Sequence, residues 1–189
     1  MNRIVILASG SGSNAENIIK YFNNNESISV TQVLTNKKDA KVLERAKRLN
    51  ISSGIFNREE FSKSNVVLDI LKKKADYIIL AGFLWKIPET IIEAFPNKII
   101  NIHPALLPKY GGKGMYGMHV HDAVVENKEK ESGITIHFVN ENYDEGAIVF
   151  QKKFEVLPSD SAEDVANKVH TLEYENFPKV IEQVILKNG

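Results

Sequence analysis

The sequence predicts an α/β protein built on a doubly wound, mostly parallel sheet. Short apolar runs of strand length alternate with stretches of helical apolar spacing, and the first apolar run leads directly into a glycine- and serine-rich turn. Strands that alternate with helices are joined by right-handed crossovers, which makes neighbouring strands parallel. The chain has 189 residues, of which 43% are hydrophobic, so we expect one domain that covers residues 1–189.

The predicted elements follow from the spacing of the apolar residues. Predicted parallel strands cover residues 3–8, 29–34, 53–56, 77–81 and 98–102. The helices between them run through 18–22, 40–49 and 58–73, and a fourth, with Pro88 in its first turn, runs through 91–95. These elements account for the first half of the chain.

The second half changes pattern after the loop 104–118 and a predicted helix over 119–127. Two β-rich runs, 133–139 and 147–156, are joined by a polar loop over 140–146, which predicts an antiparallel pair added to the sheet. A last helix over 161–187 closes the chain. Its start has Ser161 and Asp164 at the spacing of a capping box.

The composition argues against several classes of partner. Lysine plus arginine equals aspartate plus glutamate at 24 each, so the chain offers no bulk field to attract nucleic acid or an anionic membrane. Cysteine is absent, which excludes disulfides and thiolate chemistry and fits a cytoplasmic protein. The longest apolar stretch, Tyr77–Trp85, is far shorter than the roughly 20 residues of a membrane helix. We expect small-molecule ligands.

A glycine-rich segment, Gly10–Ala15, fits the pattern G-x-G-x-x-A between the first strand and its helix. In that position free backbone N–H groups and the helix dipole are directed at an anion, which favours phosphate binding. A tight turn that merely needs glycine is the alternative. A dinucleotide site would require an acidic residue about 20 positions later. None occurs before Asp39, so a single phosphate is favoured.

Asn101 and His103 stand at the carboxyl end of the fifth predicted strand, the edge at which open α/β sheets bind ligands. Residues two apart in a strand point the same way, and Pro104 favours an extended His103. An amide beside an imidazole can stabilise a developing oxyanion and move a proton. A turn-capping asparagine and a surface histidine are the alternative. Asp144 is the candidate third group, although aspartate is also common in hairpin loops.

The segment from Asn101 to Tyr110, NIHPALLPKY, resembles the signature loop of the folate-dependent formyltransferases. The resemblance extends over nearly the whole chain, because further pieces recur in order at compatible spacing: Gly10–Asn14, Ala81–Phe83, Gly133–Val139, Asp144–Gly146 and Glu173. It implies a Rossmann-like fold and transfer of a formyl group from 10-formyltetrahydrofolate to the amine of 5'-phosphoribosylglycinamide in purine synthesis. It implies no metal.

The resemblance also implies roles for individual residues. The catalytic residues would be Asn101, His103 and Asp144. The ribonucleotide would be held by Gly12, Ser13, Asn14 and Glu173. The folate would contact Arg58, Leu84, Trp85, Lys86, Ile87 and Asn101. His119 and His137 have family counterparts near the site, whereas His121 and His170 fit the surface equally well.

Two segments depart from the family's pattern. Trp85 brings an aromatic surface where other members often carry arginine, and the glycine-rich loop 111–118 is longer than usual and fits either a lid or a passive insertion.

Three alternatives stay open: a transformylase for another amine such as methionyl-tRNA, a deformylase, and a non-catalytic nucleotide-binding module. The first two carry an additional domain, which the one-domain expectation disfavours. If Asp144 pairs with His103, we expect it to raise the histidine pKa.

Overall fold

The structure, a computed structural model, describes residues 1–142 and 144–188. Its strands are β1 (Asn2–Leu7), β2 (Ile28–Thr35), β3 (Ser52–Ile55), β4 (Tyr77–Leu80), β5 (Ile99–His103), β6 (Glu131–Phe138) and β7 (Ile148–Glu155). Its helices are α1 (Ser13–Phe22), α2 (Val42–Arg48), α3 (Arg58–Ser62), α4 (Val66–Lys74), α5 (Glu89–Ala94), α6 (Met118–Glu126) and α7 (Ala162–Asn188).

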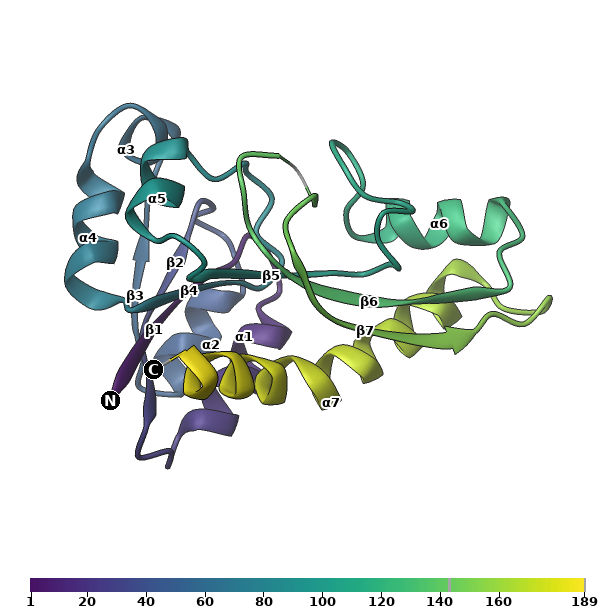
Figure 1. Cartoon of the computed structure of the whole chain (residues 1–189), viewed down its shortest axis with the longest axis horizontal. Coiled ribbons are helices and arrows are strands. Elements are labelled where there is room, and N and C mark those ends of the chain that lie inside the picture. Colours follow the sequence, from purple (N-terminus) through teal and green to yellow (C-terminus); the bar gives the residue numbers. More distant parts are fainter. Residues whose placement is uncertain (143, 189) are drawn as a thin grey trace.

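All these strands form a single sheet in the order β3-β2-β1-β4-β5-β6-β7 (Figure 1). The pairs from β3 to β5 are parallel, and β6 and β7 add to β5 as an antiparallel pair. The predicted doubly wound, mostly parallel sheet with its antiparallel extension and closing helix is therefore confirmed. Most predicted elements agree with the structure to within one or two residues.

One predicted element is wrong: residues 58–73 form two helices rather than one. The first, α3, begins with a capping box in which the Asn57 side chain accepts from the Glu60 N–H at 3.0 Å. It ends after one turn, where the Ser64 N–H donates to the carbonyl of Glu59. The connecting residues 63–65 include a serine and an asparagine, whose side chains compete for backbone hydrogen bonds and weaken a helix.

Helices cover both faces of the parallel strands, and the strands alternate accordingly (Figure 1). In β1, Ile4 and Ile6 pack in a core with residues of α1, α2 and α7. Val5 and Leu7 face the opposite core, which contains residues of α3, α4 and α5. Burial on both faces explains why these strands are apolar throughout rather than alternating with polar residues.

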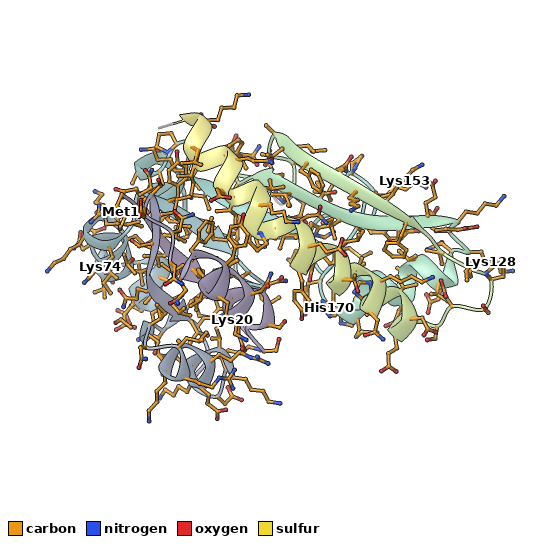
Figure 2. All side chains as sticks on the ribbon, turned by 90° about the horizontal axis from the view of Figure 1, so that it is seen from below. Met1, Lys20, Lys74, Lys128, Lys153 and His170 are labelled. Carbon is orange, nitrogen blue, oxygen red and sulfur yellow. The ribbon has the colours of Figure 1, made fainter. Side chains whose placement is uncertain are left out.

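Helix α7 crosses the sheet on the same side as α1, with His170 along its length (Figure 2). The predicted cap is confirmed, since Ser161 N–H donates to Asp164 at 2.9 Å and Asp164 N–H donates to Ser161 at 3.2 Å. Pro178 lies inside the helix, and it cannot donate to the carbonyl of Tyr174. That carbonyl instead accepts from Asn17 of α1 at 3.0 Å, so the proline helps join the two helices.

In the described part of the chain, we find no helix that combines the length and the apolar character needed to cross a membrane.

Candidate active site

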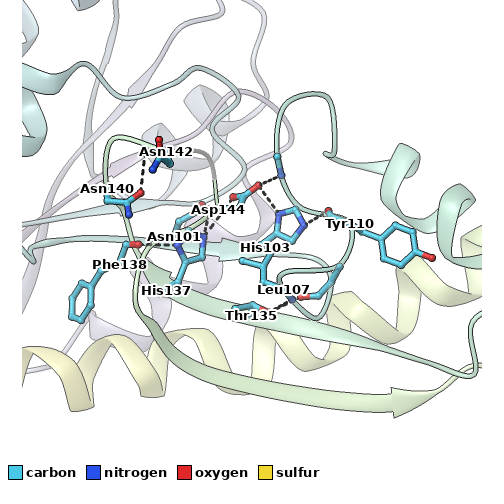
Figure 3. Close-up of polar contacts among 12 residues, drawn as sticks. Asn101, His103, Leu107, Tyr110, Thr135, His137, Phe138, Asn140, Asn142 and Asp144 are labelled. Atoms are coloured by element: carbon cyan, nitrogen blue, oxygen red, sulfur yellow. Dashed lines mark hydrogen bonds and ion pairs between the residues drawn. The ribbon is translucent and has the colours of Figure 1, made fainter.

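The pairing of β5 with β6 assembles the centre of the site. Asn101 lies opposite His137 and His103 lies opposite Thr135. Directly opposed residues of neighbouring strands project to the same face, so all four side chains share one face of the sheet. The Asn101 Nδ2 atom is 3.1 Å from His137 Nε2 (Figure 3). Sequence reasoning gave His137 little weight, because the antiparallel register that places it opposite Asn101 is not visible in the sequence.

The hydrogen bonds of His137 orient the Asn101 amide. His137 Nδ1 lies 2.8 Å from the carbonyl of Phe138, and because a carbonyl only accepts, Nδ1 carries a proton. An Nε2 atom without a proton accepts the N–H that Asn101 presents to it, whereas a protonated one faces the Asp144 carboxylate at 3.6 Å. Among the described residues, no hydrogen bond uses the second amide N–H or the amide oxygen of Asn101, so both can face a ligand.

Asp144 lies between the two imidazoles, as Figure 3 shows. One carboxylate oxygen is 3.6 Å from His103 Nδ1 and the other is 3.6 Å from His137 Nε2. The backbone N–H of Gly112 also donates to this carboxylate at 2.9 Å. Burial alone would raise the pKa of Asp144, but the interaction with His137, the charge of His103 and the Gly112 amide together lower it. The structure therefore brings Asp144 to Asn101 and His103, as the sequence hypothesis required.

His103 is 4% exposed, and its Nε2 atom lies 2.7 Å from the carbonyl of Tyr110. Burial lowers the pKa of His103 below its ordinary value, while Asp144 and the Tyr110 carbonyl oppose the change without overcoming it. Asp144 acts on this pKa in the expected direction, but the expected net rise above the value of a free histidine is wrong. The expectation considered the carboxylate alone, but removing an imidazolium from water costs more than the carboxylate at 3.6 Å returns.

The first glycine-rich loop, which begins at Gly10, turns sharply into α1. Gly12 has φ +72°, and an added Cβ would lie 2.7 Å from the Cα of Val42, so the position requires glycine. Arg45 of α2 supports the loop, since it donates to the carbonyl of Ser11 at 2.8 Å and pairs with Glu16. No described side chain caps the start of α1, which leaves its first amides to an anion.

Helix α7 supplies a second polar cluster beside this loop. Asn14 donates to Glu173 at 2.8 Å, and His170 Nδ1 lies 2.9 Å from the same carboxylate oxygen. The hydrogen bond with Glu173 raises the pKa of His170. Sequence reasoning could not separate His170 from a surface histidine, although its spacing of three residues from Glu173 on one helix was an available signal.

A cavity of about 780 Å³ connects the two clusters. Its wall includes every site residue expected from the sequence except one: Gly12, Ser13, Asn14, Leu84, Trp85, Lys86, Ile87, Asn101, His103, Asp144 and Glu173. His121 also lines it and is buried, which lowers the pKa of its imidazole. Residues 112–118 form another part of the wall, so the longer loop is more than a distant surface insertion. His119 is outside the lining and packs edge-on against Tyr116.

Arg58 is the exception and does not line the cavity. Its guanidinium carbon lies 4.7 Å from the centre of the Trp85 ring, a cation–π arrangement. Trp85 is half-buried and also packs against three phenylalanines: Phe56, Phe61 and Phe83. The tryptophan is thus part of the core and part of the cavity wall. Arg58 therefore contacts a residue of the cavity wall rather than the cavity itself.

The described residues contain no group of three or more His, Cys, Asp or Glu side chains arranged to hold a metal ion.

Fold and site together define a class of protein. It is a doubly wound α/β protein whose ligand cavity runs along the carboxyl edge of the sheet, from a glycine loop at a helix start to an asparagine, a histidine and an aspartate. Comparison with known proteins gives the family. A family model described as formyl transferase matches residues 2–181, and the chain belongs to that family.

Two similar proteins carry the same name. The chain is 38% identical over 186 residues to a chloroplastic phosphoribosylglycinamide formyltransferase of Arabidopsis thaliana, covering 95% of this chain and 64% of that protein. It is 34% identical over 196 residues to the phosphoribosylglycinamide formyltransferase of Bacillus subtilis, covering 100% of this chain and 97% of that one.

Solved structures of similar proteins support the same family assignment. The crystal structure of glycinamide ribonucleotide transformylase 1 from Geobacillus kaustophilus superimposes with a TM-score of 0.88 at 30% identity, covering 97% of this chain and 98% of that one. The phosphoribosylglycinamide formyltransferase of Bacillus halodurans gives a TM-score of 0.87 at 31% identity, covering 99% and 97%.

Proposed function

We propose that this protein transfers the formyl group of 10-formyltetrahydrofolate to the amine of 5'-phosphoribosylglycinamide, a step of purine synthesis. One observation carries the proposal: a single cavity joins Asn101, His103 and Asp144 to the glycine loop and Glu173. An acyl transfer between two bound molecules needs such a shared space, with an anion site at one end and polar groups for the oxyanion at the other. The names of the relatives point to the same reaction.

The ribonucleotide would occupy the end of the cavity formed by α1 and α7. The phosphate is assigned to the open amides that follow Gly12, with Ser13 and Asn14 beside it. Glu173 is assigned to the ribose hydroxyls, because its carboxylate can accept from them and is already oriented by Asn14 and His170. The buried Oδ1 atom of Asn14 has no protein hydrogen-bond partner in the described residues, which fits a role toward a ligand.

The folate is assigned to the wall formed by Leu84–Ile87. This wall fits a flat, partly polar heterocycle, because it combines the Trp85 ring with the apolar side chains of Leu84 and Ile87 and the amine of Lys86. Bound 10-formyltetrahydrofolate supplies a formyl carbon at which an amine can attack. Asn101 lies on the same cavity wall, where its free amide N–H can reach the formyl oxygen. Arg58 is assigned a supporting contact through Trp85.

His103 and Asp144 would assist the transfer of the proton that the substrate amine must lose. Because burial lowers its pKa, His103 is neutral in the resting protein at neutral pH and can accept this proton directly or through water. The imidazolium that results faces Asp144, which stabilises it, and its positive charge favours the oxyanion beside Asn101. The same proton then passes to the departing folate nitrogen, so the step needs neither a metal nor a covalent enzyme intermediate.

The test is an absorbance assay of the released folate product, with phosphoribosylglycinamide as acceptor. We expect turnover that depends on both substrates, and a large loss in the isosteric variant Asn101→Asp. Formate plus ATP in place of the folate donor, and methionyl-tRNA in place of the acceptor, serve as comparisons. Turnover only with formate and ATP, or only with the tRNA, would assign the chain a different transfer reaction. Nucleotide binding without any turnover would make it a binding module.

A further inference from the structure

A buried hydroxyl on β6 lies opposite the histidine of the site in the register of β5 and β6. Thr135 is 0% exposed and is the register partner of His103. Its Oγ1 atom accepts from the Leu107 N–H at 3.0 Å and from the Gln151 side chain at 2.9 Å, and it donates to the Ala105 carbonyl at 2.7 Å. A hydroxyl has one donor and two acceptor sites, so all three are used.

Gln151 of β7 extends the same network. It lies opposite Thr135 in the register of β6 and β7, and its Nε2 atom also donates to the Leu107 carbonyl at 2.9 Å. Both backbone polar groups of Leu107 are therefore held by side chains of the antiparallel pair. Leu107 belongs to the irregular segment that leaves β5 immediately after His103, where regular strand pairing no longer holds the backbone.

The segment held in this way carries the acceptor that orients His103. It continues to Tyr110, whose carbonyl lies 2.7 Å from His103 Nε2. Because a carbonyl only accepts, Nε2 carries the proton, and Nδ1 is the nitrogen that faces Asp144 at 3.6 Å. A displacement of the segment would move the Tyr110 carbonyl and thereby free the imidazole to turn or to change tautomer.

We propose that Thr135, assisted by Gln151, is a positioning residue that sets the orientation and tautomer of His103 through the backbone of residues 105–110. The inference rests on the proposed function for its kinetic consequence. The hydroxyl of Thr135 does not touch a substrate. It holds the backbone segment that continues to Tyr110, whose carbonyl bonds His103. Serine can replace threonine in this role because it has the same hydroxyl, whereas valine has the same shape and none.

The experiment compares Thr135→Val with Thr135→Ser in the full chain. We expect Thr135→Val to lower kcat on the order of 10²-fold while both KM values change little, because small misplacements of a reacting group cost about that much. Thr135→Ser should restore most of the rate. Thr31→Val is the matched control, since the Thr31 hydroxyl also bonds the backbone, at the carbonyls of Ile4 and Lys74, but lies on β2. It should lower thermal stability without lowering kcat.

A spectroscopic measurement makes the test independent of turnover. In ¹⁵N NMR of the wild-type protein, neutral His103 should show the tautomer protonated at Nε2, and Thr135→Val should shift it toward a mixture while Thr135→Ser does not. If the chain has no transferase activity but this pattern appears, the proposed function fails and the positioning role stands. An unchanged tautomer together with unchanged kcat in Thr135→Val overturns the positioning role.

A second variant covers the case in which Thr135→Val does not fold. Gln151→Met removes the amide at an exposed position while keeping the length of the side chain. It should fold, lower kcat by a smaller factor than the threonine change, and broaden or shift the His103 ring signals. Wild-type kcat and wild-type ring signals in Gln151→Met would contradict the proposal.

Discussion

The Asp144 carboxylate lies 3.6 Å from His103 Nδ1, yet the two residues come from the β6–β7 loop and from the end of β5. The pairing of β5 with β6 carries the loop back over the strand end. The contact also counters the burial that lowers the pKa of His103. Removing the carboxylate is therefore the most direct test of how the pair works.

We expect Asp144→Asn to lower the His103 pKa further, because it removes the charge that opposes the effect of burial most strongly. Turnover should fall by roughly 10²–10⁴-fold, the usual range for loss of proton-transfer assistance. An NMR titration of His103 in both backgrounds measures the first effect, and the kinetics of Asp144→Asn, His103→Ala and the double mutant measure the second. The double mutant should be little worse than the worse single mutant. Losses that multiply, with an unmoved pKa, would reduce Asp144 to a loop residue.

The pH dependence follows from the same shift. The proposed mechanism requires neutral His103, whose pKa lies below its ordinary value of 6.5. The pH profile of kcat/KM should therefore have a rising limb at that lowered pKa. The profile should level off by neutral pH. In Asp144→Asn the limb should move to lower pH. A limb that falls with increasing pH through the His103 pKa found by NMR would instead assign the imidazolium as the resting form.

Gly12→Val should weaken nucleotide binding by about tenfold or more while folate binding changes little. The substitution places a β-branched side chain at a positive φ, against Val42, and so displaces the amides at the start of α1. Calorimetric titration of each ligand measures the two affinities. Gly10→Ala is the comparison, because an added Cβ there meets nothing within 4 Å, and it should bind nucleotide more tightly than Gly12→Val. Equal loss of both ligands in a folded Gly12→Val protein would argue against the assignment.

Trp85 is the single tryptophan of the chain, so its fluorescence reports on the proposed folate wall without interference. A saturating folate analogue should change the emission in the absence of nucleotide, whereas nucleotide alone should change it less. Arg58→Met should alter the emission of the free protein, because it removes the cation above the Trp85 ring. It should also weaken binding of the folate analogue by a few-fold. An emission that is indifferent to the analogue would remove Trp85 from the folate site.

Glu16 provides a prediction for stability. Hydrogen bonds from Lys20 and Arg45, with the charge of Arg48, lower its pKa from 4.5 to about 2. The ion pairs therefore stabilise the fold above pH 4.5, and this contribution is lost as the pH falls toward 2. Glu16→Gln should lower the free energy of unfolding at pH 7 by about 1 kcal/mol, because its cations are partly exposed and screened. Denaturant unfolding at several pH values should show the difference from wild type vanishing in acid.

Local patterns in the sequence determined the order of the elements, the glycine loop and the Asn101–His103 pair at a strand end. Each depends on residues adjacent in the chain, such as an apolar run or a spacing of two along a strand. The break between α3 and α4 was missed because the apolar spacing of 58–73 continues through it, while capping and turn hydrogen bonds end the first helix.

Tertiary structure alone decided how the pieces of the site meet. Strand register placed His137 beside Asn101 and Thr135 beside His103, and a hairpin returned Asp144 to the same face. The direction of the His103 pKa depended on how completely other segments cover the imidazole, a quantity that no neighbouring residue in the sequence expresses. Distance and burial depend on how segments pack together. For that reason the sequence indicated most of these residues but could not predict their contacts or pKa shifts.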